Sequence, residues 1–287
     1  MSRSAGRATV GRLAGAAAAA ALVVGLLPTS GTAASGPTLQ RRTVGKSVIL
    51  VASEPRPHAK PTKRASSTVS DFDGDGVDDL AVAGDTRFLV AQADRPSGSV
   101  AVRYSSVQRE DLLMGVTETT PAVCGNFGEA ALATGDFNHD GRDDLVVSET
   151  CESTTGTSGY ATAGAVWVFP GSTTGLHLST ARLISRATPG VSGSPVAGEY
   201  FGQALAAGDL DADGYDDLAV GAPRSTVGGE PSAGSVVVLY GGRYGLSGVG
   251  SKAITQSTAG VPGSASQYRR FGGGLAIGKV TEDRYPD

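Results

Sequence analysis

Three acidic segments of the chain have the residue types and the spacing that calcium coordination requires. Each follows the pattern Asp-x-Asp/Asn-x-Asp-Gly-x-x-Asp, and they begin at Asp71, Asp136 and Asp209. Ca²⁺ is a hard ion that takes roughly six to eight oxygen ligands at ~2.3–2.6 Å. Oxygens at alternate positions of a tight loop can meet at one point, and the glycine at the sixth position permits the sharp bend. The pattern therefore predicts three calcium loops.

In each loop the candidate ligands are the side chains at positions one, three, five and nine and the carbonyl oxygen at position seven. They are Asp71, Asp73, Asp75, Val77 and Asp79 in the first loop, Asp136, Asn138, Asp140, Arg142 and Asp144 in the second, and Asp209, Asp211, Asp213, Tyr215 and Asp217 in the third. The varied seventh side chain fits a ligand that acts through its backbone. The aspartate at position eight is expected to face solvent or to cap backbone amides. Phe72, Phe137 and Leu210, at position two, are expected to point into the fold.

An EF-hand uses a similar loop, but it needs a helix on each side and a Glu at position twelve. Position twelve is Val82, Val147 or Val220 here, and the flanking residues read as strands. These features exclude an EF-hand.

The loops belong to a long repeat, because their start points lie 65 and 73 residues apart. Each unit predicts four short strands: a Phe-Gly segment, the run after the acidic loop, a Gly-x-Val-x-Val run, and a less regular outer strand such as 181–185. The Phe-Gly pairs begin at Phe127, Phe201 and Phe271. Repeated four-stranded units of ~60–70 residues without helical periodicity are typical of propeller blades. A β-sandwich would need no such repeat.

The segment 201–223, from Phe-Gly to Gly-Ala-Pro, resembles the FG-GAP repeat of the integrin α-subunit head, which many secreted bacterial proteins also carry. The resemblance covers about 67–287. It implies a seven-bladed propeller, Ca²⁺ in the loop between the first two strands of some blades, and a binding or adhesion module. We therefore predict an all-β propeller of four-stranded blades, incomplete in this chain, with about three blades plus one strand. A longer natural chain is expected; closure by other copies is the alternative.

The units depart from the family pattern in places. The first lacks a Phe-Gly pair before Asp71. A fourth copy at 279–287 has Lys279 and Thr281 where the first two ligands belong, so no tight Ca²⁺ site is expected there.

The chain divides into three predicted regions. Residues 1–34 combine a basic start with an apolar run and small residues, which indicates a cleavable secretory signal, with a membrane anchor as the alternative. Residues 35–66 are expected to be a linker, in which 47–51 forms either a lone strand or one paired at a propeller seam. Residues 67–287 are expected to hold the repeats, divided at about 67–126, 127–200, 201–270 and a partial 271–287. No further stretch is long enough to span a membrane.

The charge balance limits the class of partner, and the two cysteines indicate a disulfide. From residue 71 onward the chain has 14 basic and 27 acidic residues, a net charge of −13, which favours cations and argues against nucleic acid. Export and an even count favour a disulfide between Cys124 and Cys151, with two separate buried thiols as the alternative.

No catalytic set is evident. His58, His139 and His177 have no nucleophile motif near them, and a saturated calcium cage leaves no open position for substrate. We predict a secreted, non-enzymatic module that binds an extracellular protein or glycan. The alternative is the non-catalytic propeller of a secreted hydrolase or lyase. Trp167 is expected to pack between blades rather than stack on a sugar.

Overall fold

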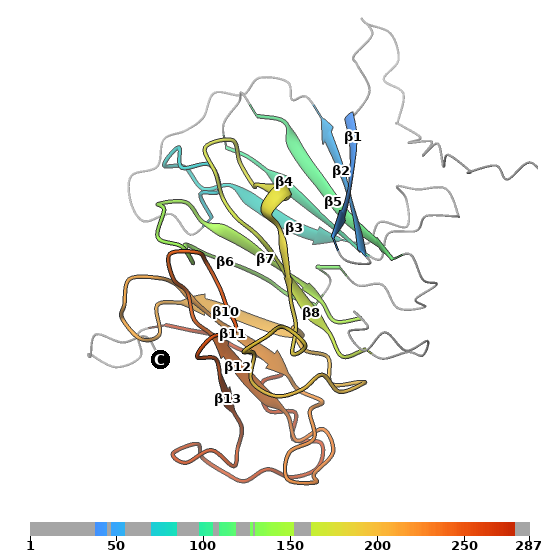
Figure 1. Cartoon of the computed structure of the whole chain (residues 1–287), viewed down its shortest axis with the longest axis vertical. Helices are drawn as coiled ribbons and strands as arrows, with labels where there is room; N and C mark the ends of the chain where they lie inside the picture. Colours follow the sequence, from blue (N-terminus) through green and yellow to red (C-terminus); the bar gives the residue numbers. More distant parts are fainter. Residues whose placement is uncertain are drawn as a thin grey trace, which may run out of the picture.

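The computed structural model describes residues 38–44, 47–54, 70–84, 98–105, 109–118, 127–128, 130–151 and 162–278. Within these ranges the chain forms thirteen strands in three antiparallel sheets. The sheets follow one another along the long axis of the molecule (Figure 1). The only helical element in the described part is a single 3₁₀ turn, η1 (Leu178–Thr180). The predicted all-β class is confirmed.

The second and third sheets each contain four strands in chain order. The second blade comprises β6 (Leu132–Gly135), β7 (Asp144–Glu149), β8 (Ala165–Phe169) and β9 (Arg182–Ile184). The third blade comprises β10 (Ala204–Gly208), β11 (Asp217–Ala222), β12 (Ser235–Leu239) and β13 (Lys252–Ile254). In both, the acidic loop joins the first two strands, and the predicted four-stranded blade is confirmed.

The first sheet has five strands in the order β1-β2-β5-β4-β3. Its blade strands are β3 (Leu80–Gly84), β4 (Ser99–Arg103) and β5 (Asp111–Glu118), to which β2 (Ser47–Glu54) and β1 (Thr38–Val44) add on the outer edge. The run 47–51 is thus a paired strand, antiparallel to both β1 and β5. An innermost strand would precede Ser70, and that segment lies outside the described residues.

Hydrophobic cores fill the spaces between successive blades. One cluster joins the first and second blades and includes Phe72, Trp167 and Phe169; the other joins the second and third and includes Phe137 and Phe201. Every residue of β7 and β8, the two central strands of their sheet, is buried, and the same holds for β11 and β12 in the next sheet. Trp167 has no exposed surface and stacks on Phe169 with ring centroids 6.1 Å apart, which confirms its packing role.

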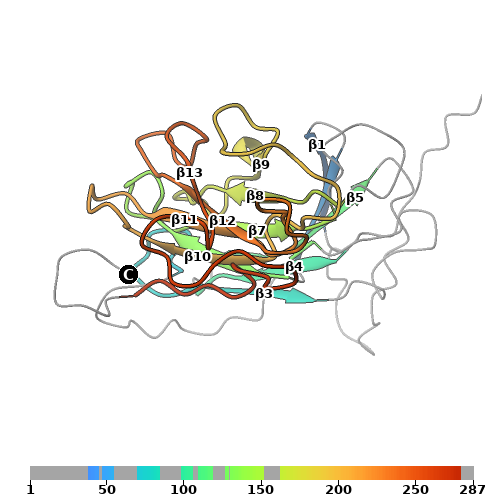
Figure 2. The same ribbon diagram turned by 90° about the horizontal axis from the view of Figure 1, so that it is seen from below.

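The Phe-Gly pairs lie in turns just before the innermost strands rather than within them. Phe201 donates its backbone N–H to the carbonyl of Ala163 in the preceding blade at 2.9 Å, and Phe271 does the same to Ala233. A Cβ on Gly164 would lie 2.2 Å from the Phe201 carbonyl oxygen, so only glycine fits there. The pair is therefore a joint between blades. Viewed from below, β9 and β13 lie toward one side of the molecule and β3 and β10 toward the other (Figure 2).

Candidate calcium loops

The three acidic loops lie along one edge of the stacked sheets, on the left in Figure 1. In each, the carboxylate at position one accepts hydrogen bonds from amides of its own loop. Asp71 accepts from Gly74, Asp75 and Gly76 at 2.8, 3.1 and 2.8 Å. Asp136 and Asp209 accept from the amides at positions five and six in the same way. The turn glycines permit this because their φ angles are positive, as in Gly76 at 80°.

The carboxylate at position nine ties the loop to the end of the third strand of its blade. Asp79 accepts from Phe72 N at 3.0 Å and from Ser105 N at 2.7 Å, just after β4. Asp217 accepts from Leu210 N and Gly241 N, each at 2.9 Å. These contacts fix the closing carboxylate before any ion arrives.

Carboxylate oxygens converge in two of the loops. One oxygen each of Asp71, Asp73 and Asp79 lies within 4.8 Å of the others, and the same holds for Asp209, Asp211 and Asp217. In the second loop position three is Asn138, and its acids alone form no such group among the described residues. Three oxygens at this spacing suit a divalent cation rather than any neutral ligand.

Position five does not join these groups. Asp75 accepts from Val77 N at 2.9 Å and from Ser105 Oγ at 3.2 Å. Asp213 accepts from Tyr215 N at 2.9 Å. The seventh carbonyl of the first loop accepts from Ser105 Oγ at 3.3 Å. The ligand roles predicted for positions five and seven therefore stay predictions.

Burial makes the closing carboxylates unusually basic. It raises the pKa of Asp79 to about 7 and that of Asp144 to about 7, against a common starting value of 3.8, with further contributions from neighbouring carboxylates. It raises the pKa of Asp217 to about 6. A site that crowds buried carboxylates in this way is destabilised by its own charge unless a cation binds.

The aspartate at position eight connects successive loops. Asp143 accepts from the backbone N–H of Asp71 at 2.8 Å, and Asp216 accepts from that of Asp136 at 2.9 Å. Of the two roles expected at this position, amide capping is the one observed, and the capped amide belongs to the preceding blade. The equivalent Asp78 has a buried Oδ1 without a hydrogen-bond partner among the described residues.

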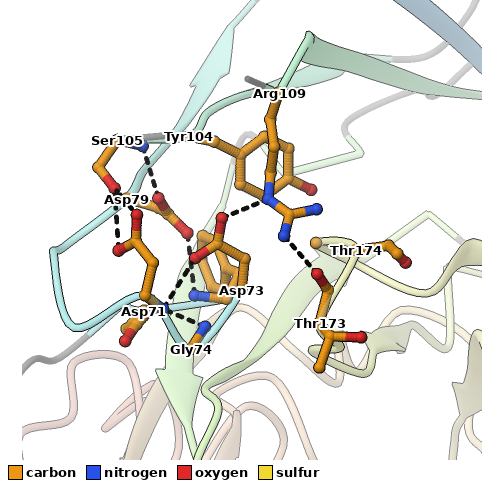
Figure 3. A network of polar contacts seen from close by, with 12 residues as sticks. Asp71, Asp73, Gly74, Asp79, Tyr104, Ser105, Arg109, Thr173 and Thr174 are labelled. Atoms are coloured by element: carbon orange, nitrogen blue, oxygen red, sulfur yellow. Dashed lines mark hydrogen bonds and ion pairs between the residues drawn. The ribbon is translucent and has the colours of Figure 1, made fainter. Parts of the chain in front are cut away.

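Arg109 is a site residue that sequence reasoning missed. It lies just before β5, and its guanidinium forms an ion pair with Asp73 and donates to the carbonyl of Thr173 (Figure 3). Arg109 is 36 residues from Asp73 in the chain, and no local pattern links them. The fold brings them together because the end of β4 meets the first loop.

With this geometry established, comparison with known proteins identifies the repeat. A family model described as the FG-GAP repeat matches residues 127–169 and 201–239. These two segments are FG-GAP repeats. They contain the second and third blades through β8 and β12, with their acidic loops. The FG-GAP segments thus coincide with the parts of the structure in which the Phe-Gly joint and the acidic loop occur together.

Integrin α-subunits are similar to part of this chain. Integrin alpha pat-2 of Caenorhabditis briggsae is 30% identical over 190 residues, which cover 63% of this chain. Integrin alpha-PS5 of Drosophila melanogaster is 30% identical over 159 residues and human integrin alpha-IIb is 32% identical over 162, each covering 55% of this chain. The aligned part spans 14% of the length of each of these relatives. The predicted likeness to the integrin α propeller is confirmed.

Several predicted features fall at the margin of the FG-GAP region. Cys151 is buried just after β7, whereas Cys124 lies outside the described residues, so their pairing stays a prediction. The fourth acidic copy from Lys279 onward and the N-terminal 37 residues also lie outside them. Within the described part, no helix has the length and apolar character needed to cross a bilayer.

Proposed function

We propose that this chain is a secreted, adhesion-type binding module in which Ca²⁺ occupies the acidic loops and holds neighbouring blades in register. The single observation that carries the proposal is the convergence of three carboxylate oxygens within 4.8 Å in both the first and third loops. Several buried, mutually repelling carboxylates require a compensating cation, and an all-oxygen donor set selects Ca²⁺ over softer metals.

The loops are placed where an ion would act on blade packing. At position two, Phe72 and Phe137 are fully buried in the cores between blades, whereas Leu210 is only partly buried. The carbonyls of the same two residues accept from Ser172 N at 3.1 Å and Gly242 N at 3.0 Å in the following blade. An ion that fixes the loop therefore also fixes the position of the next blade.

Binding rather than catalysis is the activity that this arrangement supports. We assign Ca²⁺ a structural role, with the positions listed for the three loops as its ligands, and an extracellular protein or glycan as the partner. Export through residues 1–34, repeats over 67–287 and a Cys124–Cys151 disulfide belong to the same proposal. The segment 35–66, expected to be a linker, instead contributes β1 and β2 to the first sheet. The integrin likeness supports an extracellular setting.

The proposal is tested by measuring bound calcium and thermal unfolding of the purified chain. Calcium binding is followed by equilibrium dialysis with elemental analysis, and unfolding by circular dichroism with Ca²⁺ or with EGTA. We expect bound calcium and a higher melting temperature with Ca²⁺. Asp211→Ala, which removes an exposed ligand that makes no hydrogen bond in the loop, should reduce both effects. Glu230→Gln, an exposed acid outside the loops, is the control. A chain that binds no calcium and melts identically in both buffers refutes the proposal.

A further inference from the structure

The first loop differs from the third because a side chain of the protein already supplies it with positive charge. Arg109 forms an ion pair with Asp73, whose side chain has no exposed surface, while the arginine side chain is 23% exposed. Its guanidinium carbon also lies 5.8 Å from the centre of the Tyr104 ring. Asp73 is one of the three carboxylates that converge in this loop.

The same guanidinium reaches the neighbouring blade. It donates to the carbonyl of Thr173, in the turn that follows β8, beside Asp73 (Figure 3). Tyr104 continues the connection, because its hydroxyl accepts from Leu176 N at 2.9 Å. Arg109 therefore bridges the candidate ion site of the first blade and a turn of the second.

Within the described part of the chain, no such cation reaches the third loop. Among the residues that the structure describes, no Lys or Arg forms an ion pair with Asp209, Asp211 or Asp217. Asp211, which stands at the position of Asp73, is exposed. The second loop is intermediate: Asn138 is neutral there, Arg142 forms an exposed ion pair with Asp140 at 3.7 Å, and Arg182 acts on Asp144 through space. The three loops thus differ in how far the protein neutralises them by itself.

We infer that Arg109 is an internal competitor of Ca²⁺ at the first loop, so that the third loop binds the ion more tightly and the first fills only when the guanidinium leaves Asp73. The inference rests on the proposed calcium binding and adds an order of affinities to it. An Asp73 oxygen held by the guanidinium is not free for the ion, and the two cations repel each other at this range.

Occupancy of the first loop is thereby coupled to the contact between the blades. An ion that displaces Arg109 from Asp73 also frees the arginine to change its contact with Thr173. By linkage, a partner that holds Arg109 on Asp73 and so weakens calcium binding at the first loop is itself bound less tightly, by the same factor, when calcium is bound there. The first loop is then a regulated site, whereas the third is a constitutive one.

The test compares calcium isotherms of the wild type, Arg109→Gln and Arg109→Lys, with Arg269→Gln as the control. Arg269 is exposed and donates only to Ser266 among the described residues, so its removal changes net charge without touching a loop. Each isotherm is measured by equilibrium dialysis and by titration calorimetry at fixed ionic strength. Unfolding in EGTA verifies that each variant is folded.

For the wild type we expect at least one tight and one weaker class of site. Arg109→Gln should tighten the weaker class by about tenfold to a hundredfold, as expected for the loss of one competing charge-assisted hydrogen bond. Arg109→Lys keeps a cation and should stay close to the wild type, as should Arg269→Gln. Adding Asp73→Ala to Arg109→Gln should abolish the gain, which places it at the first loop.

The possible outcomes separate this inference from the proposed function. If the wild type binds calcium but Arg109→Gln leaves the isotherm unchanged, the inference is overturned and the calcium module stands. If Arg109→Lys gains as much as Arg109→Gln, competition by charge is overturned. If no variant binds calcium, both proposals fall.

Discussion

The ion-free and calcium-bound forms are expected to respond to pH with opposite signs. Burial raises the pKa of Asp79 from 3.8 to about 7 in the ion-free fold. A carboxyl group whose pKa is raised on folding stabilises the fold fully below its unfolded pKa, and this contribution is lost as pH rises through the folded pKa. The stability of the ion-free protein should therefore fall between about pH 4 and pH 7.

The expected size follows from the same shift. A change of about three pKa units corresponds to about 4 kcal/mol for one group. Part of this is already lost below pH 5, and about 2.6 kcal/mol is lost between pH 5 and pH 8. For a domain of this size 1 kcal/mol moves the melting temperature by roughly 2–4 °C, which gives a decrease of about 5–10 °C from pH 5 to pH 8. The pKa values of Asp144 and Asp217 are raised as well, so the figure for Asp79 alone sets the sign and the order of magnitude of the change in melting temperature.

Calcium should reverse this dependence because the ion binds only the ionised carboxylates. The assay is thermal unfolding at pH 5, 6, 7 and 8, once with EGTA and once with saturating Ca²⁺. With Ca²⁺ the melting temperature should rise with pH, and the difference between the two buffers should be largest at pH 8. Asp79→Asn should make the EGTA series less steep, leaving the contributions of Asp144 and Asp217, whereas Glu230→Gln, an exposed acid outside the loops, should not change it. An EGTA series that is flat or that rises with pH would refute the reasoning.

Two further predictions concern the joints between blades. Glu199→Gln removes the anion that faces Arg186 at 3.2 Å in a buried pair, and should destabilise the protein by about 3–5 kcal/mol, measured by denaturant unfolding; a loss below 1 kcal/mol would contradict this. Asp216→Ala uncaps the backbone N–H of Asp136 and should cost about 1–3 kcal/mol and weaken calcium binding at the second loop, measured by melting and dialysis. Unchanged stability would show that water replaces the cap. Glu230→Gln serves as the control for both.

Much of the fold could be predicted from the sequence because each unit repeats its own local rules. The acidic loop, the glycine before the third strand and the alternating apolar residues are short-range signals, and all three recur. The burial of Phe72 and Trp167 followed from the same pattern, since an apolar residue at a fixed place in a repeat faces the next repeat. These elements are determined within about ten residues of chain.

What the sequence did not reveal depends on contacts between distant residues. Arg109 meets Asp73 because the end of β4 lies beside the first loop of the same blade. Arg186 pairs with Glu199 of its own unit and reaches Ser235 because the next blade packs against it. The pairing of β2 with β5 is likewise non-local, so the apolar run 47–51 indicated a strand but not the strand with which it pairs. The Phe-Gly pair was assigned to a strand because its neighbours are apolar, but the backbone N–H of Phe201 donates to the preceding blade, whereas that of Gly202 donates to its own. In the loops, the carboxylate at position five accepts hydrogen bonds from amides of its own turn, and the ligand pattern does not predict this.

The cap at position eight has a consequence for how such chains can grow. Asp143 and Asp216 each grip a main-chain amide, which every residue except proline offers whatever its side chain. This hydrogen bond therefore requires no particular side chain in the preceding unit, only the shape of its turn. If a gene duplicates or loses one whole unit, the same hydrogen bond can form between the new neighbouring units, because a backbone amide needs no matching side chain. Length in this architecture can vary by whole units while each seam stays chemically the same.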